Sequence, residues 1–318
     1  MHGQKIRRSL DLSNWEAAVK QTREWELFAP EGTLTVALAC KKFLADATAS
    51  KLAEGTILKY RQATKSLKPL EEKTVRQVSV DDIRIIREGW KIAAITMQKR
   101  LETIRAFFNF CISSGWADVN PADSVKAPIV NQEPTMPFDD DDIAKIFDAL
   151  ETKYLEAHPQ STDLMKRKIK AFILVMLYSG VRISDCVFLR KTDVQSGRLF
   201  LYTHKTKVPV KVPLPEEALK ALKAVEGECY FSTGRGKVKT WTTEWEERLK
   251  KVFVLAGLPE VHSHMLRDTF ATRLLVKGVP IETVAALLGN TVKVVEKHYS
   301  PWVHVRQGAL EESVRKTW

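Results

Sequence analysis

The segment H-M-L-R, from His264 to Arg267, places an imidazole and a guanidinium three residues apart. At the start of a helix, side chains at this spacing project from one face, so the pair is able to hold one phosphate group. The same pair arises by chance on protein surfaces, and its spacing alone does not separate the two interpretations. Two short helical stretches interrupted by Gly278 and Gly289 follow, and they lead to Tyr299 in a basic setting. A phosphate site beside a tyrosine is therefore the first hypothesis.

The composition favours a polyanionic partner. The 318 residues carry a formal net charge of +11, and Lys and Arg outnumber Asp and Glu both before and after residue 130. Each phosphate that a basic side chain neutralises releases condensed counterions, which favours binding to nucleic acid. The apolar fraction of 44% and the length allow two domains, each with its own core.

Several other classes of protein are disfavoured. The cysteines Cys40, Cys111, Cys186 and Cys229 form no C-x-x-C pair, which argues against a zinc knuckle or a disulfide framework. No segment approaches the roughly 20 apolar residues that span a bilayer. The run Asp139–Asp142 lacks the spaced ligands of a calcium loop and better suits a helix N-terminus. We expect a cytoplasmic, nucleoid-associated protein without metal, cofactor or membrane partner.

Helical periodicity dominates the first part of the chain. A short polar helix is predicted from Asn14 to Glu26, before Pro30. Apolar residues then recur at intervals of three and four, which predicts an all-α bundle. The stretches with this period are 34–44, 56–67, 80–90 and 92–113.

A linker and a second domain follow. The stretch Val125–Phe138 holds three prolines and no helical period, which is typical of an interdomain linker. In Arg198–Leu214 apolar residues alternate, which predicts a β-hairpin with Lys205 and Lys207 at its tip. The remaining predicted helices are 168–179, a helix from 182, 243–256, 265–277, 281–288 and 292–299.

The order of these motifs resembles the tyrosine recombinases, the phage integrases and their chromosomal relatives. The string H-M-L-R-D-T-F-A-T, then L-G-N, then Tyr299 is similar to the family's C-terminal signature. Upstream, S-G-V-R-I-S-D-C-V-F-L-R-K-T-D-V matches the family's first arginine motif at Arg182, and H-K-T-K-V-P-V-K-V-P-L matches its lysine hairpin at Lys205. The resemblance covers about residues 34–300.

The resemblance implies a mainly α, two-domain fold: an N-terminal helical core-binding (SAM-like) bundle and a C-terminal mixed α/β catalytic domain with a small antiparallel sheet. The implied division is an N-terminal extension (1–30), a core-binding DNA-binding domain (31–124), the linker (125–138), the catalytic domain (139–300) and a tail for packing between subunits (301–318). Double-stranded DNA is the implied partner, bound by a tetramer with accessory DNA-bending proteins.

The resemblance also implies a role for each catalytic residue. Tyr299 is the nucleophile that forms a 3′-phosphotyrosine ester and stores the energy of the broken bond without ATP. Arg182 and Arg267 have planar guanidinium groups that pair with phosphate and stabilise the transition state in place of a metal. Lys205 is the general acid for the leaving 5′ oxygen, and His264 assists proton movement at the tyrosine or holds a phosphate oxygen.

Each assignment has a structural alternative. Arg182 near Asp185 is also suited to a buried ion pair, in which Asp185 orients the arginine. Lys207 lies on the same predicted tip as Lys205 and competes with it for the role of general acid. Tyr299 is also suited to a core position with a satisfied hydroxyl. His262 and His298 are interpreted as packing or surface residues, because no acid or cysteine stands at ligand spacing.

Two residues depart from the family pattern. Asn290 stands where the family has His or Trp; its amide is able to donate a hydrogen bond to the phosphate, but it carries no titratable proton. We include Asn290 among the catalytic candidates. Asp268 stands where many members have a second His, and we interpret it as tolerated variation.

Basic residues of the bundle are predicted to contact the DNA backbone, with hydroxyl groups between them. A solvated helix face explains the same pattern equally well. The candidates are Lys51, Lys59, Tyr60, Arg61, Lys65, Thr96, Lys99, Arg100 and Arg105, together with Lys207 of the hairpin.

The sequence therefore predicts a site-specific recombinase that integrates or excises a phage or another mobile element. Two alternatives stay open. One is a non-catalytic DNA-binding protein, because 278–290 resembles part of a helix-turn-helix motif. The other is a strand-relaxing enzyme like a type IB topoisomerase, which shares the tyrosine chemistry.

Overall fold

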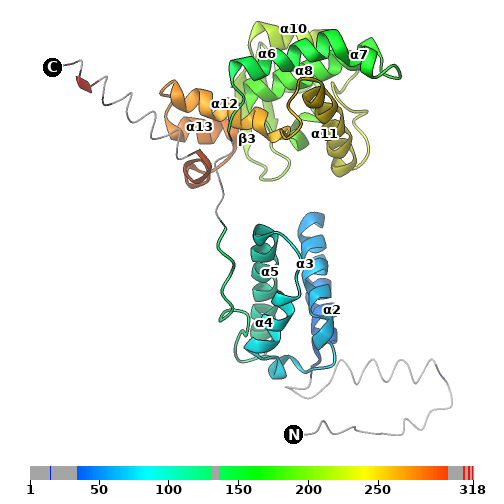
Figure 1. Cartoon of the computed structure of the whole chain (residues 1–318), viewed down its shortest axis with the longest axis vertical. Coiled ribbons are helices and arrows are strands. Elements are labelled where there is room, and N and C mark those ends of the chain that lie inside the picture. Colours follow the sequence, from blue (N-terminus) through cyan, green and yellow to red (C-terminus); the bar gives the residue numbers. More distant parts are fainter. Residues whose placement is uncertain are drawn as a thin grey trace. The chain divides into compact units, whose positions relative to one another are not determined.

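The computed structural model describes residues 34–130 and 136–299, with the single positions Trp15, Glu311, Val314, Arg315 and Thr317. The chain divides into two compact units, Met1–Gln132 and Glu133–Trp318 (Figure 1). The predicted helix at 14–26 and the predicted packing tail at 301–318 lie outside the described residues, apart from those single positions.

The described part of the first unit is a helical bundle. Its helices are α2 (Val36–Ala49), α3 (Glu54–Ser66), α4 (Val80–Glu88) and α5 (Ala94–Ser113). The turns between them include 3₁₀ segments at Lys68–Leu70 and Val75–Gln77. The periodic stretches of the sequence therefore form helices as predicted, with bounds that shift by a few residues.

Aromatic side chains fill the centre of the bundle. Phe107 packs edge-on against Phe43 and Phe108, with ring centroids 5.7 and 5.0 Å away. Ile104 and Leu101, about one and two turns before Phe107 on α5, are fully buried. At the start of α4, the Ser79 hydroxyl accepts the N–H of Asp82, which satisfies one of the free donors at the helix N-terminus.

The second unit is mixed but mainly helical. Its first helices are α6 (Asp140–Asp148), the π-turn Ala149–Lys153, α7 (Tyr154–Ala157), α8 (Asp163–Ser179) and α9 (Ile183–Cys186). A 3₁₀ turn at Lys191–Asp193 leads into β1 (Val194–Gln195), β2 (Arg198–Tyr202) and β3 (Pro209–Pro213). The later helices are α10 (Glu216–Lys223), α11 (Val238–Leu255), α12 (His264–Val276) and α13 (Ile281–Leu288), and residues 292–299 are also helical.

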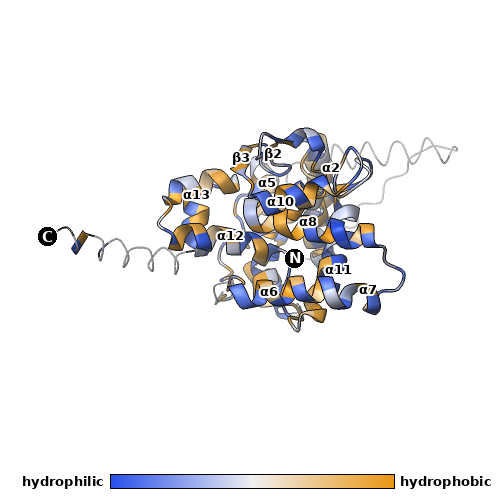
Figure 2. Ribbon diagram, turned by 90° about the horizontal axis from the view of Figure 1, so that it is seen from above, coloured by the Kyte–Doolittle hydropathy of each residue, from blue (hydrophilic) through white to orange (hydrophobic). Residues whose placement is uncertain are grey.

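Helix α8 lies at the centre of the second unit. Its segment from Ala171 to Leu177 is buried without interruption, as expected for a helix with neighbours on all sides. Phe172 stacks on Trp245 of α11 with ring centroids 4.2 Å apart, and the Trp245 indole N–H donates to the Phe231 carbonyl at 2.8 Å. By contrast, α6 and α11 carry both hydrophobic and hydrophilic residues along their length (Figure 2).

The predicted hairpin is confirmed. Strands β2 and β3 pair antiparallel, with Leu199 opposite Val212 and Leu201 opposite Val210, and β1 adds a short third strand beside β2. Alternate residues of β2 and β3 are buried, so one face of the sheet packs on the core.

The ends of the predicted linker belong to the two cores. Val125 is buried among the helices of the first unit. Phe138 is buried in the second unit, and its backbone N–H donates to the Thr269 hydroxyl at 2.9 Å. Within the described residues, no helix is long and apolar enough to cross a membrane.

Candidate active site

The candidate catalytic residues come from elements that meet around the C-terminal end of α8. Arg182 is the residue before α9, and Lys205 lies in the turn between β2 and β3. His264 and Arg267 stand in the first turn of α12. Asn290 follows α13, and Tyr299 ends the helical segment 292–299.

Arg267 joins two helix ends. Its side chain is 2% exposed, and its guanidinium donates to the Gly180 carbonyl at 2.5 Å and to the Leu288 carbonyl at 2.9 Å. Both carbonyls stand at C-terminal ends, of α8 and α13, where the helix dipoles favour a positive charge. Burial lowers the pKa of Arg267 to about 10, with a contribution from the charge of Arg182, so the group stays cationic at neutral pH.

Arg182 is held by Asn290 rather than by an acid. One terminal guanidinium nitrogen donates to Asn290 Oδ1 at 2.6 Å, and the other is buried without a hydrogen-bond partner among the described residues. Asp185 Oδ1 instead accepts the backbone N–H of His204 at 2.7 Å. No ion pair joins Arg182 to Asp185 in the described part of the chain, so the structure does not support the alternative of a buried ion pair oriented by Asp185.

Tyr299 is buried, and its hydroxyl faces a carboxylate. The side chain is 6% exposed, and the hydroxyl donates to Asp268 Oδ1 at 2.5 Å. Burial raises the pKa of Tyr299 well above its ordinary value, the Asp268 carboxylate raises it further, and the charges of Arg267 and Arg182 oppose both effects. The hydroxyl is thus satisfied, as in the core-tyrosine alternative, but by an acid beside the arginines.

His264 lies near the same carboxylate. Its Nε2 is 3.9 Å from Asp268 Oδ1, beyond hydrogen-bond distance. Loss of hydration lowers the pKa of His264 below its ordinary value of 6.5, and the charges of Arg267 and Arg182 act in the same direction, while Asp268 opposes them.

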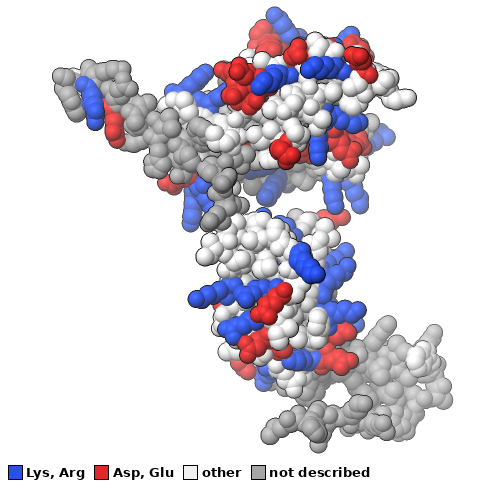
Figure 3. Space-filling view, in the orientation of Figure 1, with Lys and Arg blue, Asp and Glu red and all other residues white. Residues whose placement is uncertain are grey.

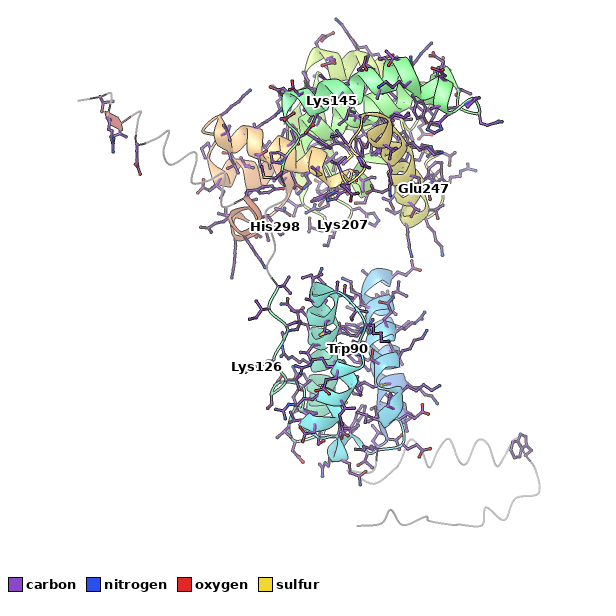
Figure 4. All side chains as sticks on the ribbon, viewed as in Figure 1. Trp90, Lys126, Lys145, Lys207, Glu247 and His298 are labelled. Atoms are coloured by element: carbon purple, nitrogen blue, oxygen red, sulfur yellow. The ribbon has the colours of Figure 1, made fainter. Side chains whose placement is uncertain are left out.

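Both lysines of the hairpin tip are exposed, and Figure 4 shows Lys207 at the edge of the second unit. The turn is closed by the Lys207 N–H, which donates to the Thr203 carbonyl at 2.9 Å, and Lys207 adopts a positive φ of 56°. Neither ammonium group makes a hydrogen bond to another described residue. Lys207 borders a cavity of about 460 Å³ together with Asp185 and His204, whereas Lys205 is not among the residues that line it. The choice between Lys205 and Lys207 stays a prediction.

Comparison with known proteins decides the family. A model of the phage integrase family matches residues 137–300, which is more than half of the 318 residues. The chain belongs to this family. It is therefore a tyrosine recombinase, a DNA strand-exchange enzyme, as its motifs predicted.

Individual relatives agree with this assignment. A tyrosine recombinase of Thermosipho africanus is 28% identical over 202 residues, covering 62% of this chain and 68% of the relative. A tyrosine recombinase XerC of Pediococcus pentosaceus is 27% identical over 243 residues, covering 71% of this chain and 76% of the relative. A solved lambda integrase tetramer bound to a Holliday junction has a TM-score of 0.67 at 17% identity, over 87% of this chain and 88% of that one. The last comparison confirms the predicted fold.

Lys and Arg side chains are spread over the visible face of the recombinase's first unit (Figure 3). Of the predicted DNA-contact residues in this unit, some are exposed and others make structural contacts. The exposed candidates are Lys51, Lys59, Arg61, Lys65, Thr96 and Lys99. Three others pack within the bundle: Tyr60 stacks on Phe43 with centroids 4.6 Å apart, Arg100 lies 5.3 Å from the Trp90 ring, and Arg105 donates to the Ala122 and Val125 carbonyls at 3.1 and 2.7 Å. These contacts give Tyr60, Arg100 and Arg105 a structural role within the bundle. Their predicted contact with DNA stays a prediction.

The acidic run at the start of α6 caps that helix, as predicted. Asp139 Oδ1 accepts the N–H of Asp142 at 2.7 Å, and Asp140 pairs with Arg273 of α12. In residues 34–130 and 136–299, no group of three or more His, Cys, Asp or Glu side chains is arranged to hold a metal ion.

The structure gives Asp268, which we interpreted as tolerated variation, a specific contact: its carboxylate accepts a hydrogen bond from Tyr299, the candidate nucleophile of the recombinase. The burial that reveals this pairing is visible only in the structure. The stretch from Leu266 to Thr272 is buried throughout, and a buried acid in such a stretch is rare unless it is paired.

Proposed function

We propose that this recombinase cleaves and rejoins specific DNA sites through a covalent bond between Tyr299 and a 3′ phosphate. One observation carries the proposal. The Tyr299 hydroxyl contacts a buried carboxylate, and Arg182 and Arg267 lie close enough to affect the ionisation of the phenol. The proposed nucleophile, a buried carboxylate and two arginines suited to binding phosphate therefore share one region of the catalytic unit.

The two arginines bind the phosphate and stabilise the transition state. Negative charge builds on the non-bridging oxygens as the tyrosine attacks, and cations already fixed in place stabilise it without reorganisation. Arg267 is fixed by two carbonyls and Arg182 by Asn290. Among the described residues, the other terminal nitrogen of Arg182 has no hydrogen-bond partner, and it is a donor available to a phosphate oxygen.

The proton and bond changes balance within the chain. Tyr299 Oη gives its proton to a base of the site and forms a bond to phosphorus, the bond to the 5′ oxygen breaks, and Lys205 gives that oxygen a proton. Rejoining reverses each step. His264 holds a phosphate oxygen or assists the movement of the proton that leaves the tyrosine. The Asn290 amide N–H group donates a hydrogen bond to the phosphate.

The biological role that we propose is integration or excision of a phage or another mobile element. The description of the matching family and the likeness to lambda integrase support it. We further propose that four copies assemble on two DNA sites, with accessory DNA-bending proteins. The solved lambda integrase tetramer on a Holliday junction supports such an assembly. Sequencing of the DNA that flanks the gene, and amplification of a circular junction from cells, tests the role.

A covalent trap tests the chemistry. The full-length chain is incubated with nicked duplexes that carry a random central region, and denaturant-resistant complexes are isolated and sequenced. We expect an enriched site and a complex that disappears in Tyr299→Phe. Tyr230→Phe is the matched control, because Tyr230 is equally buried in the same unit. No complex with the wild type, or an unchanged complex with Tyr299→Phe, excludes Tyr299 as the nucleophile.

The same assay separates the two other functions. Tight binding to an enriched site without any covalent complex indicates a non-catalytic DNA-binding protein. Relaxation of a supercoiled plasmid that lacks the enriched site indicates a strand-relaxing enzyme instead of a recombinase.

A further inference from the structure

Asp268 follows Arg267 in α12 and is buried, with 5% of its surface exposed. We propose that Asp268 accepts the proton of Tyr299 when the tyrosine attacks DNA, and returns it when the strands rejoin. The proposal rests on Tyr299 being the nucleophile. It assigns the acid a catalytic role, because Asp268 Oδ1 lies 2.5 Å from the reacting oxygen.

Distance favours Asp268 over His264 as the first acceptor. A general base must lie within about 3.2 Å of the oxygen that it deprotonates, or act through one water. Among the described residues, the only hydrogen bond that the Tyr299 hydroxyl makes is to Asp268. His264 Nε2 stands 3.9 Å from the same carboxylate oxygen, so the imidazole is placed to act after the carboxylate rather than instead of it.

A purely structural role explains Asp268 poorly. A buried carboxylate is costly unless several hydrogen bonds or a paired charge compensate. In the described part of the chain, the Asp268 side chain accepts one hydrogen bond, from Tyr299. An asparagine would accept the same bond without a buried charge. What only the carboxylate adds is the capacity to take up a proton.

The charges around Asp268 suit this transfer. Asp268 lies beside Arg267 and near His264 and Tyr299. The charge of Arg182 lowers the pKa of both His264 and Tyr299. As Tyr299 Oη bonds to phosphorus, the phenol proton moves to Asp268 and the bond to the 5′ oxygen breaks. That oxygen takes a proton from the general acid, so the two protons move at opposite ends of the reacting phosphate. The neutral Asp268 then holds a proton for the tyrosine oxygen, which is the leaving group on rejoining.

Single-turnover cleavage tests the proposal. The substrate is a nicked duplex of the site enriched in the covalent trap, and the variant is Asp268→Asn in the full-length chain. General bases contribute about a hundredfold or more to such rates, so we expect Asp268→Asn to be slower by about that factor with unchanged DNA affinity. Asp140→Asn is the control, because it removes an exposed acid that pairs with the same helix. A rate within about threefold of the wild type, or a faster one, overturns the proposal.

A sulfur leaving group separates the two ends of the reaction. A thiolate departs without a proton, so a duplex with sulfur at the 5′ bridging position removes the need for a general acid. We expect this substrate to restore cleavage by a double variant that carries both Lys205→Ala and Lys207→Ala. We do not expect it to restore cleavage by the Asp268→Asn variant. Restoration of Asp268→Asn would place the acid at the leaving group and overturn the assignment.

Asp268→His covers the case in which Asp268→Asn does not fold. An imidazole accepts a proton only in its neutral form, so we expect the cleavage rate of this variant to fall as the pH drops below about 6.5. A pH profile identical to that of the wild type overturns the proposal. If the wild-type protein forms no covalent complex, the assignment of Tyr299 as nucleophile is wrong. If the wild type forms the complex but Asp268→Asn cleaves at the wild-type rate, only the role of Asp268 is wrong.

Discussion

Replacement of Gly180 by alanine is expected to destabilise the catalytic unit. Gly180 ends α8 with a left-handed φ of 62°. A Cβ built there lies 2.8 Å from Leu288 Cδ2 and closer still to the Phe270 ring. The left-handed conformation costs alanine about 1–2 kcal/mol. Overpacking of a buried site adds about 1–3 kcal/mol, so we expect a loss of about 2–5 kcal/mol.

A second glycine separates these two costs. Gly257 has a φ of 78° and no heavy atom within 4 Å of an added Cβ, so Gly257→Ala meets the backbone cost alone. The assay is unfolding in urea, followed by hydrogen exchange of the peptide that contains α8. The difference between the two variants measures the crowding, for which we expect about 1–3 kcal/mol. Equal losses would refute the argument that the contact with Phe270 and Leu288 requires glycine at position 180.

The same substitution is expected to reduce cleavage where the protein is still folded. The Gly180 carbonyl accepts a hydrogen bond from Arg267, and Arg182 follows two residues later. A shift of this turn therefore displaces both cations that we assign to the phosphate. Misplacement of fixed charges by a fraction of an ångström lowers rates without lowering DNA affinity equally. Normal single-turnover cleavage by folded Gly180→Ala protein would contradict this coupling.

Two further predictions concern charge. Asn290→Ala removes the side-chain oxygen that accepts the hydrogen bond from Arg182. A hydrogen bond to a charged group is worth about 1.5–3 kcal/mol, so we expect the rate of single-turnover cleavage to fall by about 10- to 150-fold. Cleavage by Asn290→Ala at the wild-type rate would mean that Arg182 needs no orienting partner. Replacement of Lys59, Arg61 and Lys65 by glutamine is expected to reduce the slope of log affinity against log salt by about 2.7, because each phosphate contact contributes about 0.9. An unchanged slope would identify these side chains as a solvated face.

Local patterns predicted much of the fold. Alternation of apolar residues located the hairpin, and the period of three and four located α3 and α12 to within a few residues. Strand β1 and helix α10 were not predicted. Strand β1 has only two residues, which is too short to establish a period. Length does not explain the omission of α10, since α13 also has eight residues and its bounds were predicted.

Contacts between distant segments were beyond sequence reasoning. Arg105 is spaced like a DNA-facing side chain, but its guanidinium binds carbonyls at the end of the bundle, 17 and 20 residues away. Likewise the family pattern identified Arg182 and Asn290 separately, and only the structure joins them. Such bonds depend on where loops return in space, which no local period encodes.

Each of the two departures from the family pattern contacts a residue that we assign to catalysis. Asn290 binds Arg182, and Asp268 binds Tyr299, so neither side chain is bystander variation. Attack on a phosphodiester adds negative charge near both arginines. If Asp268 takes up the phenol proton at that moment, its own charge disappears as the charge on the phosphate grows. The cations Arg182 and Arg267 then act on the transition state rather than on the carboxylate, which is the condition for differential stabilisation of the transition state.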